Sequence, residues 1–220
     1  PLTELLANYD VASYRTLFRV DEIWDTNWKI LFQNFMEPYH LFAVHSRTVE
    51  PVLPTQHAHV VTGGPGYCLY TQGRNSGVAF EYSEAMANPN PKLTEDEVNS
   101  VPLFGAFPAQ MASVSAERTF WMSLMPIETD KVRVFWGVDV HPDAMPQGAE
   151  FDERVDELKA SFHAINDEDK PITAAIARNA AALSAQPGRL SPKEQTIWEF
   201  QRYLARMLVP VPAPASKAAE

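Results

Sequence analysis

Residues 34–45 place an amide, a carboxylate and two imidazoles in a run that is otherwise mostly aromatic and apolar; these groups belong to Asn34, Glu37, His40 and His45. Polar groups in such surroundings cost free energy to bury unless each has a partner. A metal ion is one such partner, because imidazole and carboxylate together suit divalent iron, zinc or copper. A solvated helix face is the alternative, so any fold of this chain must provide one or the other.

The spacing of the two histidines limits how they could share a metal ion. His40 and His45 are five residues apart, which separates them by about 140° on a regular α-helix. Chelation therefore requires a helix end, a π-bulge or a bend near Pro38. Asn34, Glu37 and His40 follow one another at intervals of three residues and drift slowly around one helix face. This arrangement is typical of a site rather than of a plain core helix.

The segment closely resembles the catalytic-domain signature of Rieske non-haem iron oxygenase α subunits, which hydroxylate aromatic rings or perform related demethylations. The signature runs N-W-K, then E/Q-N-F, then an acidic residue, two residues, His, four residues and His. The chain carries Asn27-Trp28-Lys29, Asn34-Phe35, Glu37, His40 and His45, with Gln33 where Glu is common. The resemblance implies a mononuclear iron(II) held by His40 and His45, with a distant carboxylate as third ligand.

The resemblance places this third ligand on a late helix. The candidate stretch is 166–173, where a Glu-Asp pair is followed by Gly-Arg-Leu-Ser at 188–191, as in the family, while the family's Gln is replaced near Arg178. We expect Asp169 to be the ligand. Asp167 and Glu168 remain alternatives, because acidic residues before a helix are also ordinary partners of its dipole.

The resemblance implies other roles for two residues near the histidines. Glu37 is expected to carry the electron route from the Rieske ligand of a neighbouring subunit, although direct iron ligation by Glu37 is an alternative. Asn34 is expected to lie near the iron without firmly binding it. The substrate pocket is expected to involve apolar residues that flank the ligands, which could equally be plain core: Phe35, Met36, Phe42 and Ala43.

The other histidines and the cysteine carry less information. His57 and His59 form an H-x-H pair like that of a cupin, but residues 60–66 contain no carboxylate, so we interpret both as surface or packing residues. A Rieske cluster needs two cysteines and two histidines. Because Cys68 is the single cysteine, the 2Fe–2S cluster is expected in another domain or partner, with NAD(P)H supplying electrons through a reductase or ferredoxin. The start at Pro1 fits the seam where the family's catalytic domain begins.

Composition excludes several classes of partner. The net charge of −10 argues against nucleic acid and anionic membranes. No apolar run approaches the roughly 18 residues of a membrane span, no signal peptide opens the chain, and one cysteine suits a reducing compartment, so we expect a cytoplasmic protein. We divide the chain into an iron-binding catalytic domain over 1–208 and a disordered Pro/Ala-rich tail over 209–220.

The pattern along the chain predicts strands followed by helices. Strands are expected at 22–25, 57–61, 67–72, 78–82, 104–107, 111–114, 119–126 and 131–140, and helices at 27–37, 151–165, 172–183 and 191–208. This order indicates an α+β domain. The resemblance implies a START-like, helix-grip form, in which a curved antiparallel sheet grips C-terminal helices and a pocket lies between them.

Two functional classes follow from these features. The first is an oxygenase that activates dioxygen at a centre of two histidines and one carboxylate and hydroxylates an aromatic or other apolar substrate; oxidative demethylation is its close relative. The resemblance adds a homo-oligomer, a trimeric ring of α subunits, as the working form. The second class is a START-like module that binds a hydrophobic ligand without redox chemistry.

Overall fold

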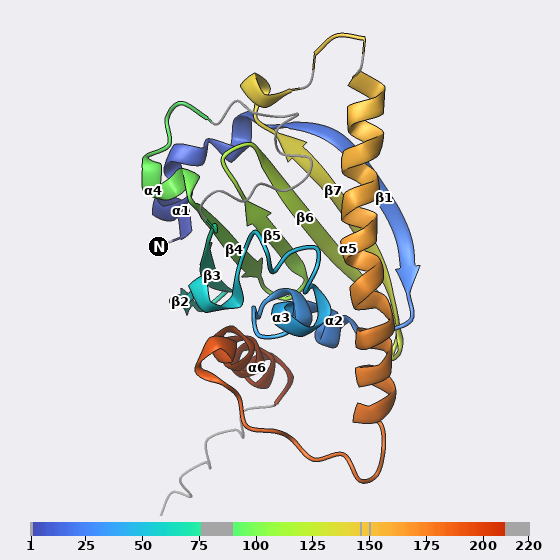
Figure 1. Ribbon diagram of the computed structural model, residues 1–220. Coiled ribbons are helices and arrows are strands. Elements are labelled where there is room, and N and C mark those ends of the chain that lie inside the picture. The colour runs from blue at the N-terminus through green and yellow to red at the C-terminus, as the bar shows by residue number, and fades with distance from the viewer. Residues whose placement is uncertain (1, 76–89, 146, 150, 210–220) are drawn as a thin grey trace, which may run out of the picture.

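Seven segments rich in aromatic and β-branched residues form one curved antiparallel sheet in the part of the chain that the structure describes. The computed structural model describes residues 2–75, 90–145, 147–149 and 151–209. The strand order is β1-β7-β6-β5-β4-β3-β2 (Figure 1). The strands are β1 (Arg15–Trp24), β2 (Ala58–Gly64), β3 (Tyr67–Gly73), β4 (Ser100–Ala106), β5 (Gln110–Val114), β6 (Arg118–Glu128) and β7 (Lys131–Val140).

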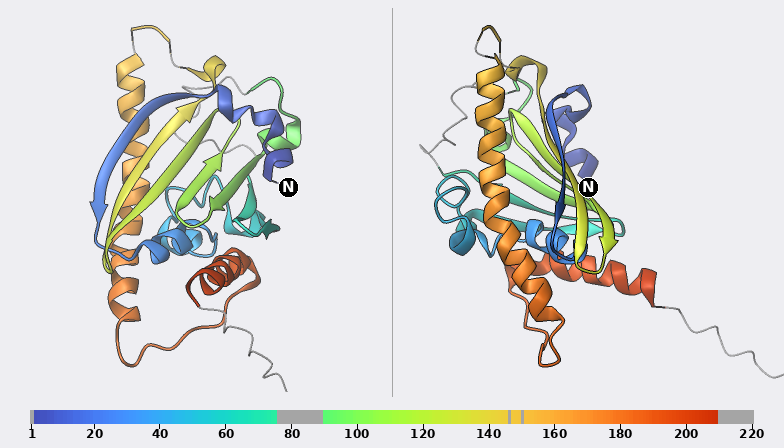
Figure 2. Two further views of the ribbon diagram at one scale, coloured as in Figure 1. Left: turned by 180° about the vertical axis from the view of Figure 1, so that it is seen from behind. Right: turned by 90° about the vertical axis from the view of Figure 1, so that its right-hand side faces the viewer.

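Six α-helices lie in the described residues, and four of them gather on one face and at one end of this sheet. The six helices are α1 (Leu2–Leu5), α2 (Trp28–Phe35), α3 (Leu41–Val44), α4 (Glu95–Val98), α5 (Phe151–Ala180) and α6 (Gln195–Leu208). The long α5 lies over the side formed by β6, β7 and β1, while α2, α3 and α6 lie at the other end of the sheet's open face (Figures 1 and 2). The expected α+β, helix-grip architecture is confirmed.

Strands β2 to β7 overlap their expected segments, but β1 is longer than the predicted strand 22–25. It pairs with β7 from Arg15 opposite Val140 to Trp24 opposite Val132. A register shift between Thr16 and Phe18 interrupts the two-residue alternation, and this bulge hides the strand in the sequence. The expected strand 78–82 and residues 210–220 of the expected tail lie outside the described residues.

Helix α5 corrects a second prediction, because the two expected helices 151–165 and 172–183 are one helix that contains Pro171. A proline inside a helix removes one N–H donor and crowds the preceding turn. Here the next turn is held by side chains: Thr26 donates to the carbonyl of Thr173 at 3.0 Å, and Thr173 Oγ1 donates to the carbonyl of Asp169 at 3.0 Å. The acidic residues 167–169 therefore lie inside a helix rather than before one.

The docking of α2 onto the sheet depends on close packing around one glycine. A Cβ atom at Gly105 of β4 would lie only 2.4 Å from Cζ of Phe32, so glycine permits α2 to approach. Phe32 in turn stacks on Phe200 of α6, with ring centroids 4.1 Å apart. The start of α6 follows the predicted capping box, in which Ser191 and Glu194 exchange hydrogen bonds with each other's backbone N–H groups. These contacts fix the position of the segment that carries the two histidines.

Candidate metal centre

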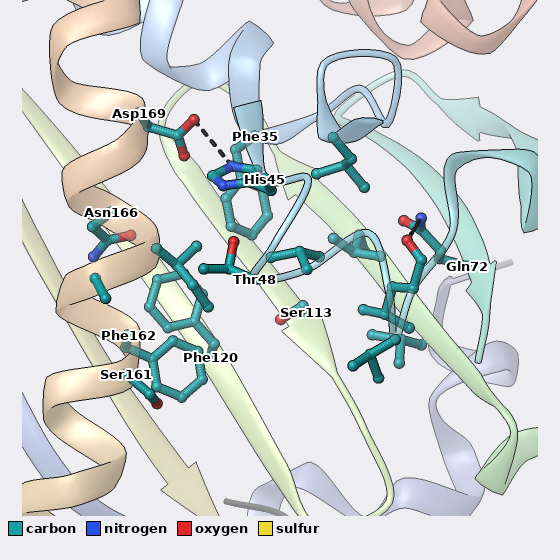
Figure 3. A pocket seen from close by; sticks show the side chains of 18 of the residues that line it. Phe35, His45, Thr48, Gln72, Ser113, Phe120, Ser161, Phe162, Asn166 and Asp169 are labelled. Carbon is teal, nitrogen blue, oxygen red and sulfur yellow. Dashed lines mark hydrogen bonds and ion pairs between the residues drawn. The ribbon is translucent and has the colours of Figure 1, made fainter. Parts of the chain in front are cut away.

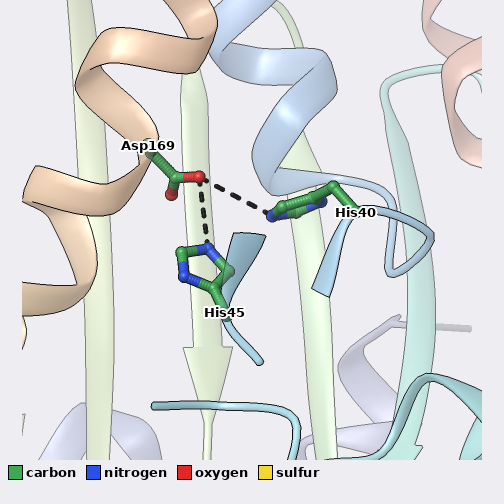
Figure 4. Close-up of side chains that lie close together, drawn as sticks. All are labelled: His40, His45 and Asp169. Carbon is green, nitrogen blue, oxygen red and sulfur yellow. Dashed lines mark ion pairs between the residues drawn. The ribbon is translucent and has the colours of Figure 1, made fainter. Parts of the chain in front are cut away.

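The two histidines are brought together by an interruption of the helical segment. Helix α2 ends at Phe35 and α3 begins at Leu41, so His40 lies directly before α3 and His45 directly after it. Their imidazole centroids are 5.1 Å apart, and both rings face α5 (Figure 4). The spacing of five residues is accommodated by a helix end, one of the three solutions expected from the sequence.

Asp169 of α5 completes a group of three side chains. Its Oδ1 lies 3.2 Å from Nε2 of His45 and 3.8 Å from Nε2 of His40 (Figure 4). One potential ligand atom from each of the three residues lies within 4.8 Å of the other two. Among the residues that the structure describes, this is the one such group of three or more His, Cys, Asp and Glu side chains.

The two alternative acids on α5 point elsewhere. The side chain of Asp167 is 63% exposed and pairs with Lys170 Nζ at 2.8 Å. Glu168 lies on the other side of His45, with Oε2 2.7 Å from Nδ1. The geometry therefore favours Asp169 over both neighbours as a third metal ligand.

Besides Asp169, which faces Nε2 of both rings, a further carboxylate contacts Nδ1 of each imidazole. Oε1 of Glu37 lies 2.7 Å from Nδ1 of His40, as Glu168 does from Nδ1 of His45. Ionised carboxylates only accept hydrogen bonds, so Nδ1 of each ring carries the proton and Nε2 presents its lone pair towards Asp169. Carboxylates in this position commonly orient metal-binding histidines and increase their basicity.

The charges and hydrogen bonds of the group fit a divalent cation. Oδ1 of Asp169 is buried and accepts no hydrogen bond within the described chain. Burial lowers the pKa of His45, but the carboxylates of Asp169 and Glu168 raise it by more, so the pKa lies above its usual value. Two imidazoles and one carboxylate are the ligand set of non-haem iron(II) oxygenases, in which other coordination positions stay open. The residues present therefore fit a mononuclear iron(II).

A cavity of about 580 Å³ opens beside this group, between the open face of the sheet, α5 and residues 47–53 (Figure 3). Apolar side chains form most of its lining, and Phe35, Phe120 and Phe162 form a stacked aromatic wall. The ring centroids of Phe35 and Phe120 are 6.0 Å apart, and those of Phe120 and Phe162 are 4.8 Å apart. Asn34 also lines the cavity, as His40, His45 and Asp169 do.

Of the four apolar residues expected in the pocket, Phe35 alone lies in the lining. Met36 is fully buried in the main core instead, because its side chain packs against Gly105 of β4. Phe42 and Ala43 are exposed on the outer side of α3, Phe42 by 53%, since the inner side of this short helix is occupied by Leu41. These three placements correct the expectation of a pocket built only from the residues around the ligands.

The lining also includes residues that lie outside the motif. Phe120 and Met122 alternate inward on β6, and Leu158 and Phe162 belong to the apolar stripe of α5. That stripe is visible in the sequence as a repeat of about four residues. The fold brings this stripe close to the two histidines, although they lie more than 100 residues earlier in the chain. No local sequence pattern predicts that contact.

The remaining candidates take no part in the group. His57 lies directly before β2 and His59 lies on β2 with its side chain exposed. His141 and His163 pack edge-on against aromatic rings. Cys68 is fully buried, as expected for a small apolar side chain. No helix within the described residues has both the length and the apolar content that crossing a bilayer would require.

Comparison with protein families gives a match over most of the chain. The model for the ring hydroxylating alpha subunit (catalytic domain) matches residues 8–209. Among curated proteins, no significant match was found.

Comparison with solved structures gives likenesses in fold at low identity. A quaternary ammonium Rieske monooxygenase, studied for carnitine oxidation and inter-subunit electron transfer, has a TM-score of 0.71 at 14% identity over 93% of this chain and 53% of its own. Dicamba monooxygenase bound to 3,6-dichlorosalicylic acid has a TM-score of 0.63 at 17% identity over 89% and 59%. Naphthalene 1,2-dioxygenase from Rhodococcus sp. bound to indole has a TM-score of 0.60 at 17% identity over 94% and 61%. The chain thus spans little more than half the length of these structures.

Proposed function

Because the chain belongs to the family of ring-hydroxylating alpha subunits, as their catalytic domain, we propose that it is the oxygen-activating part of a Rieske-type oxygenase. The observation that carries the proposal is Asp169 Oδ1, which is buried without a hydrogen-bond donor and faces Nε2 of both His40 and His45. These three side chains bind iron(II). Bound iron(II) supplies a site where dioxygen is activated beside the substrate.

The protein's own residues hold and shield this centre. Glu37 and Glu168 keep the proton on Nδ1 of each imidazole, so that Nε2 stays available for the metal. Asn34 lies beside the ligands and contributes a polar group to the cavity. The aromatic wall of Phe35 and Phe120 holds an apolar substrate against the centre and excludes water from it.

Electrons must reach the centre from outside the described residues. Cys68 alone cannot hold a 2Fe–2S cluster, so a Rieske domain or partner supplies them, fed by NAD(P)H through a reductase or ferredoxin. A homo-oligomer, a trimer in this proposal, brings the cluster of one subunit to the iron of the next. Such an enzyme works in the cytoplasm on a small aromatic or apolar molecule, by hydroxylation or by the related oxidative demethylation.

Iron content is the direct test. The purified chain, reconstituted with iron(II) without oxygen and desalted, should retain about one iron per chain, and the variants His40→Ala and Asp169→Ala should retain far less. His59→Ala is the matched control, because this histidine is exposed on β2 and should leave the iron content unchanged. A folded wild-type chain that retains no metal yet binds apolar ligands would instead indicate a START-like binding module.

A further inference from the structure

Two side chains in the cavity lining carry a buried polar atom that has no hydrogen-bond partner within the described residues: Asp169 Oδ1 and Asn166 Nδ2. The Asp169 atom belongs to the metal centre, but Asn166 has no part in that group. Asn166 is 3% exposed. An unpaired buried amide is costly, and native structures rarely keep one without a function or a missing partner.

Three other polar side chains in the same lining already donate a hydrogen bond within the protein. The Ser161 hydroxyl donates to the carbonyl of Leu158 at 2.7 Å, and the Gln72 amide donates to the carbonyl of Leu53 at 2.6 Å. Thr48 Oγ1 donates to Glu168 at 2.6 Å. The Asn166 amide differs from these groups because its Nδ2 finds no hydrogen-bond acceptor within the described chain.

The position of Asn166 places its amide next to the proposed reaction site. It precedes Asp169 by three residues on α5, so the two side chains share a helix face and are separated by a rise of about 4.5 Å. Four residues earlier on the same helix, Phe162 stacks on Phe120 of the aromatic wall (Figure 3). The amide therefore lies between the aromatic wall and the third ligand.

The charge of the lining limits which molecules could use this amide. Arg47 and Arg118 line the cavity, and Asp169 is the one carboxylate that the described lining contains. If Asp169 binds iron, no anionic side chain of the lining is left to balance a cationic ligand. A quaternary ammonium group also offers no hydrogen-bond donor or acceptor to an amide. Neutral and anionic molecules suit this cavity better.

We infer that Asn166 is a positioning residue, and that the substrate is a neutral or anionic apolar molecule whose hydroxyl, carbonyl or carboxylate oxygen accepts a hydrogen bond from the Asn166 amide. This inference rests on the proposed function. The amide can turn to present its nitrogen to the cavity, because Nδ2 has no hydrogen bond to lose within the described chain. The amide lies within one helical turn of Asp169. The substrate carbon that is oxidised therefore lies close to the substrate oxygen that accepts the hydrogen bond from Asn166.

Four probes that share one ring system test the inference: naphthalene, 2-naphthamide, 2-naphthoate and trimethyl(2-naphthyl)ammonium. Dissociation constants are measured by fluorescence titration for the wild-type chain, for Asn166→Leu, which keeps the volume, and for Ser161→Ala. Ser161 is the matched control, because it lines the same cavity but its hydroxyl proton is already used. The wild type should bind the amide and the carboxylate about tenfold more tightly than naphthalene, the factor that corresponds to about 1.4 kcal/mol, and the cation most weakly.

In Asn166→Leu the preference for the oxygen-bearing probes should fall to about twofold or less, while the affinity for naphthalene stays the same or improves. Ser161→Ala should keep the wild-type preference. The melting temperature of Asn166→Leu should not fall, since the change removes an unpaired buried amide; a marked fall would identify a structural role and overturn the inference. Tightest binding of the cation, or an unchanged preference in Asn166→Leu, would also overturn it.

Iron content measured on the same preparations tests the proposed function separately from the role of Asn166. The comparison of naphthalene, 2-naphthamide and 2-naphthoate between the wild type and Asn166→Leu requires no iron, so a chain without iron would contradict the proposed function and leave that comparison readable. The cation is compared on the iron-loaded chain, because Asp169 without iron is a free carboxylate of the lining. A chain with full iron whose probe preference ignores Asn166 would overturn this inference alone.

Discussion

Glu168 Oε2 lies 2.7 Å from Nδ1 of His45 and thereby decides which nitrogen of that ring faces Asp169. The same oxygen accepts a hydrogen bond from Thr48 at 2.6 Å, which holds the carboxylate in place. Successive residues of one helix thus serve the same imidazole from two sides, Glu168 at Nδ1 and Asp169 at Nε2. The acidic pair is a structural unit, in which one carboxylate orients the histidine and the other is placed to share a metal with it.

Replacing Glu168 by Gln should weaken iron binding about 10- to 100-fold, the usual cost of losing a partner that orients a metal ligand. The amide keeps the volume but removes the charge that stabilises the Nδ1–H form of His45. Iron affinity measured by competition with a chelator checks this. Asp167→Asn, on the exposed side of α5, is the matched control and should bind iron as the wild type does. Equal affinity in Glu168→Gln would contradict the orienting role.

Replacing Glu37 by Gln should have a different effect in the complete oxygenase. Glu37 contacts Nδ1 of His40. We propose, from the resemblance to the family, that it also carries the electron route from the neighbouring subunit. At saturating iron, Glu168→Gln should regain turnover, whereas Glu37→Gln should stay slow because electron transfer is impaired. Single-turnover kinetics with a reduced Rieske cluster check this. Turnover of Glu37→Gln within about twofold of the wild type, some 0.4 kcal/mol in barrier, would contradict the electron route.

The sequence alone allowed Asp167, Glu168 and Asp169 as third ligand. The predicted helix ended at residue 165, so the directions in which later side chains point around the helix axis could not be derived. The observed helix is continuous, and seven residues from Phe162 to Asp169 make about two turns, within about 20°. Asp167 and Glu168 point more than about 100° away from that direction. Had Pro171 been accepted inside the helix, the apolar stripe that ends at Phe162 would have selected Asp169.

Local sequence patterns predicted those strands and helix ends whose signal lies within a short stretch of residues. The strands β6 and β7 and the capped start of α6 follow from alternation and from Ser191 with Glu194. The cavity does not follow from such patterns, because its aromatic wall joins Phe35 of α2 to Phe120 of β6 and Phe162 of α5. Contacts between residues so far apart depend on sheet curvature and helix placement, which no window of sequence contains.

Removing the Thr26 hydroxyl should destabilise the part of α5 that carries Asp169. Thr26 is buried and donates to the carbonyl of Thr173, one turn beyond Asp169 and two residues after Pro171. In Thr26→Val this carbonyl keeps its helical donor but loses the bond from Thr26, which should lower the free energy of unfolding by about 0.5–1.5 kcal/mol. Urea denaturation measures the change. Thr62→Val, on the exposed side of β2, should change it by no more than about 0.5 kcal/mol; equal effects would contradict a role for this hydrogen bond.

Acid should weaken the fold partly through Glu117. Burial raises the pKa of this carboxyl, but Arg74, Arg118 and a hydrogen bond from Ser115 lower it by more, so its folded pKa lies below the ordinary value of 4.5. A folded pKa below the unfolded one means that the stabilisation is complete above the unfolded pKa and is lost as the pH falls through the folded pKa. Melting temperatures of the wild type should therefore fall below about pH 4.5 in part because Glu117 becomes protonated.

The variant Glu117→Gln isolates this contribution. It should be less stable than the wild type at pH 7, because the buried Arg118 and the partly buried Arg74 lose the carboxylate beside them, and its melting temperature should fall less steeply in acid. The two curves should therefore converge as the pH drops. Glu128→Gln, at the exposed end of β6, is the matched control and should run parallel to the wild type. Parallel curves for Glu117→Gln as well would show that this carboxylate does not contribute to the acid sensitivity of the fold.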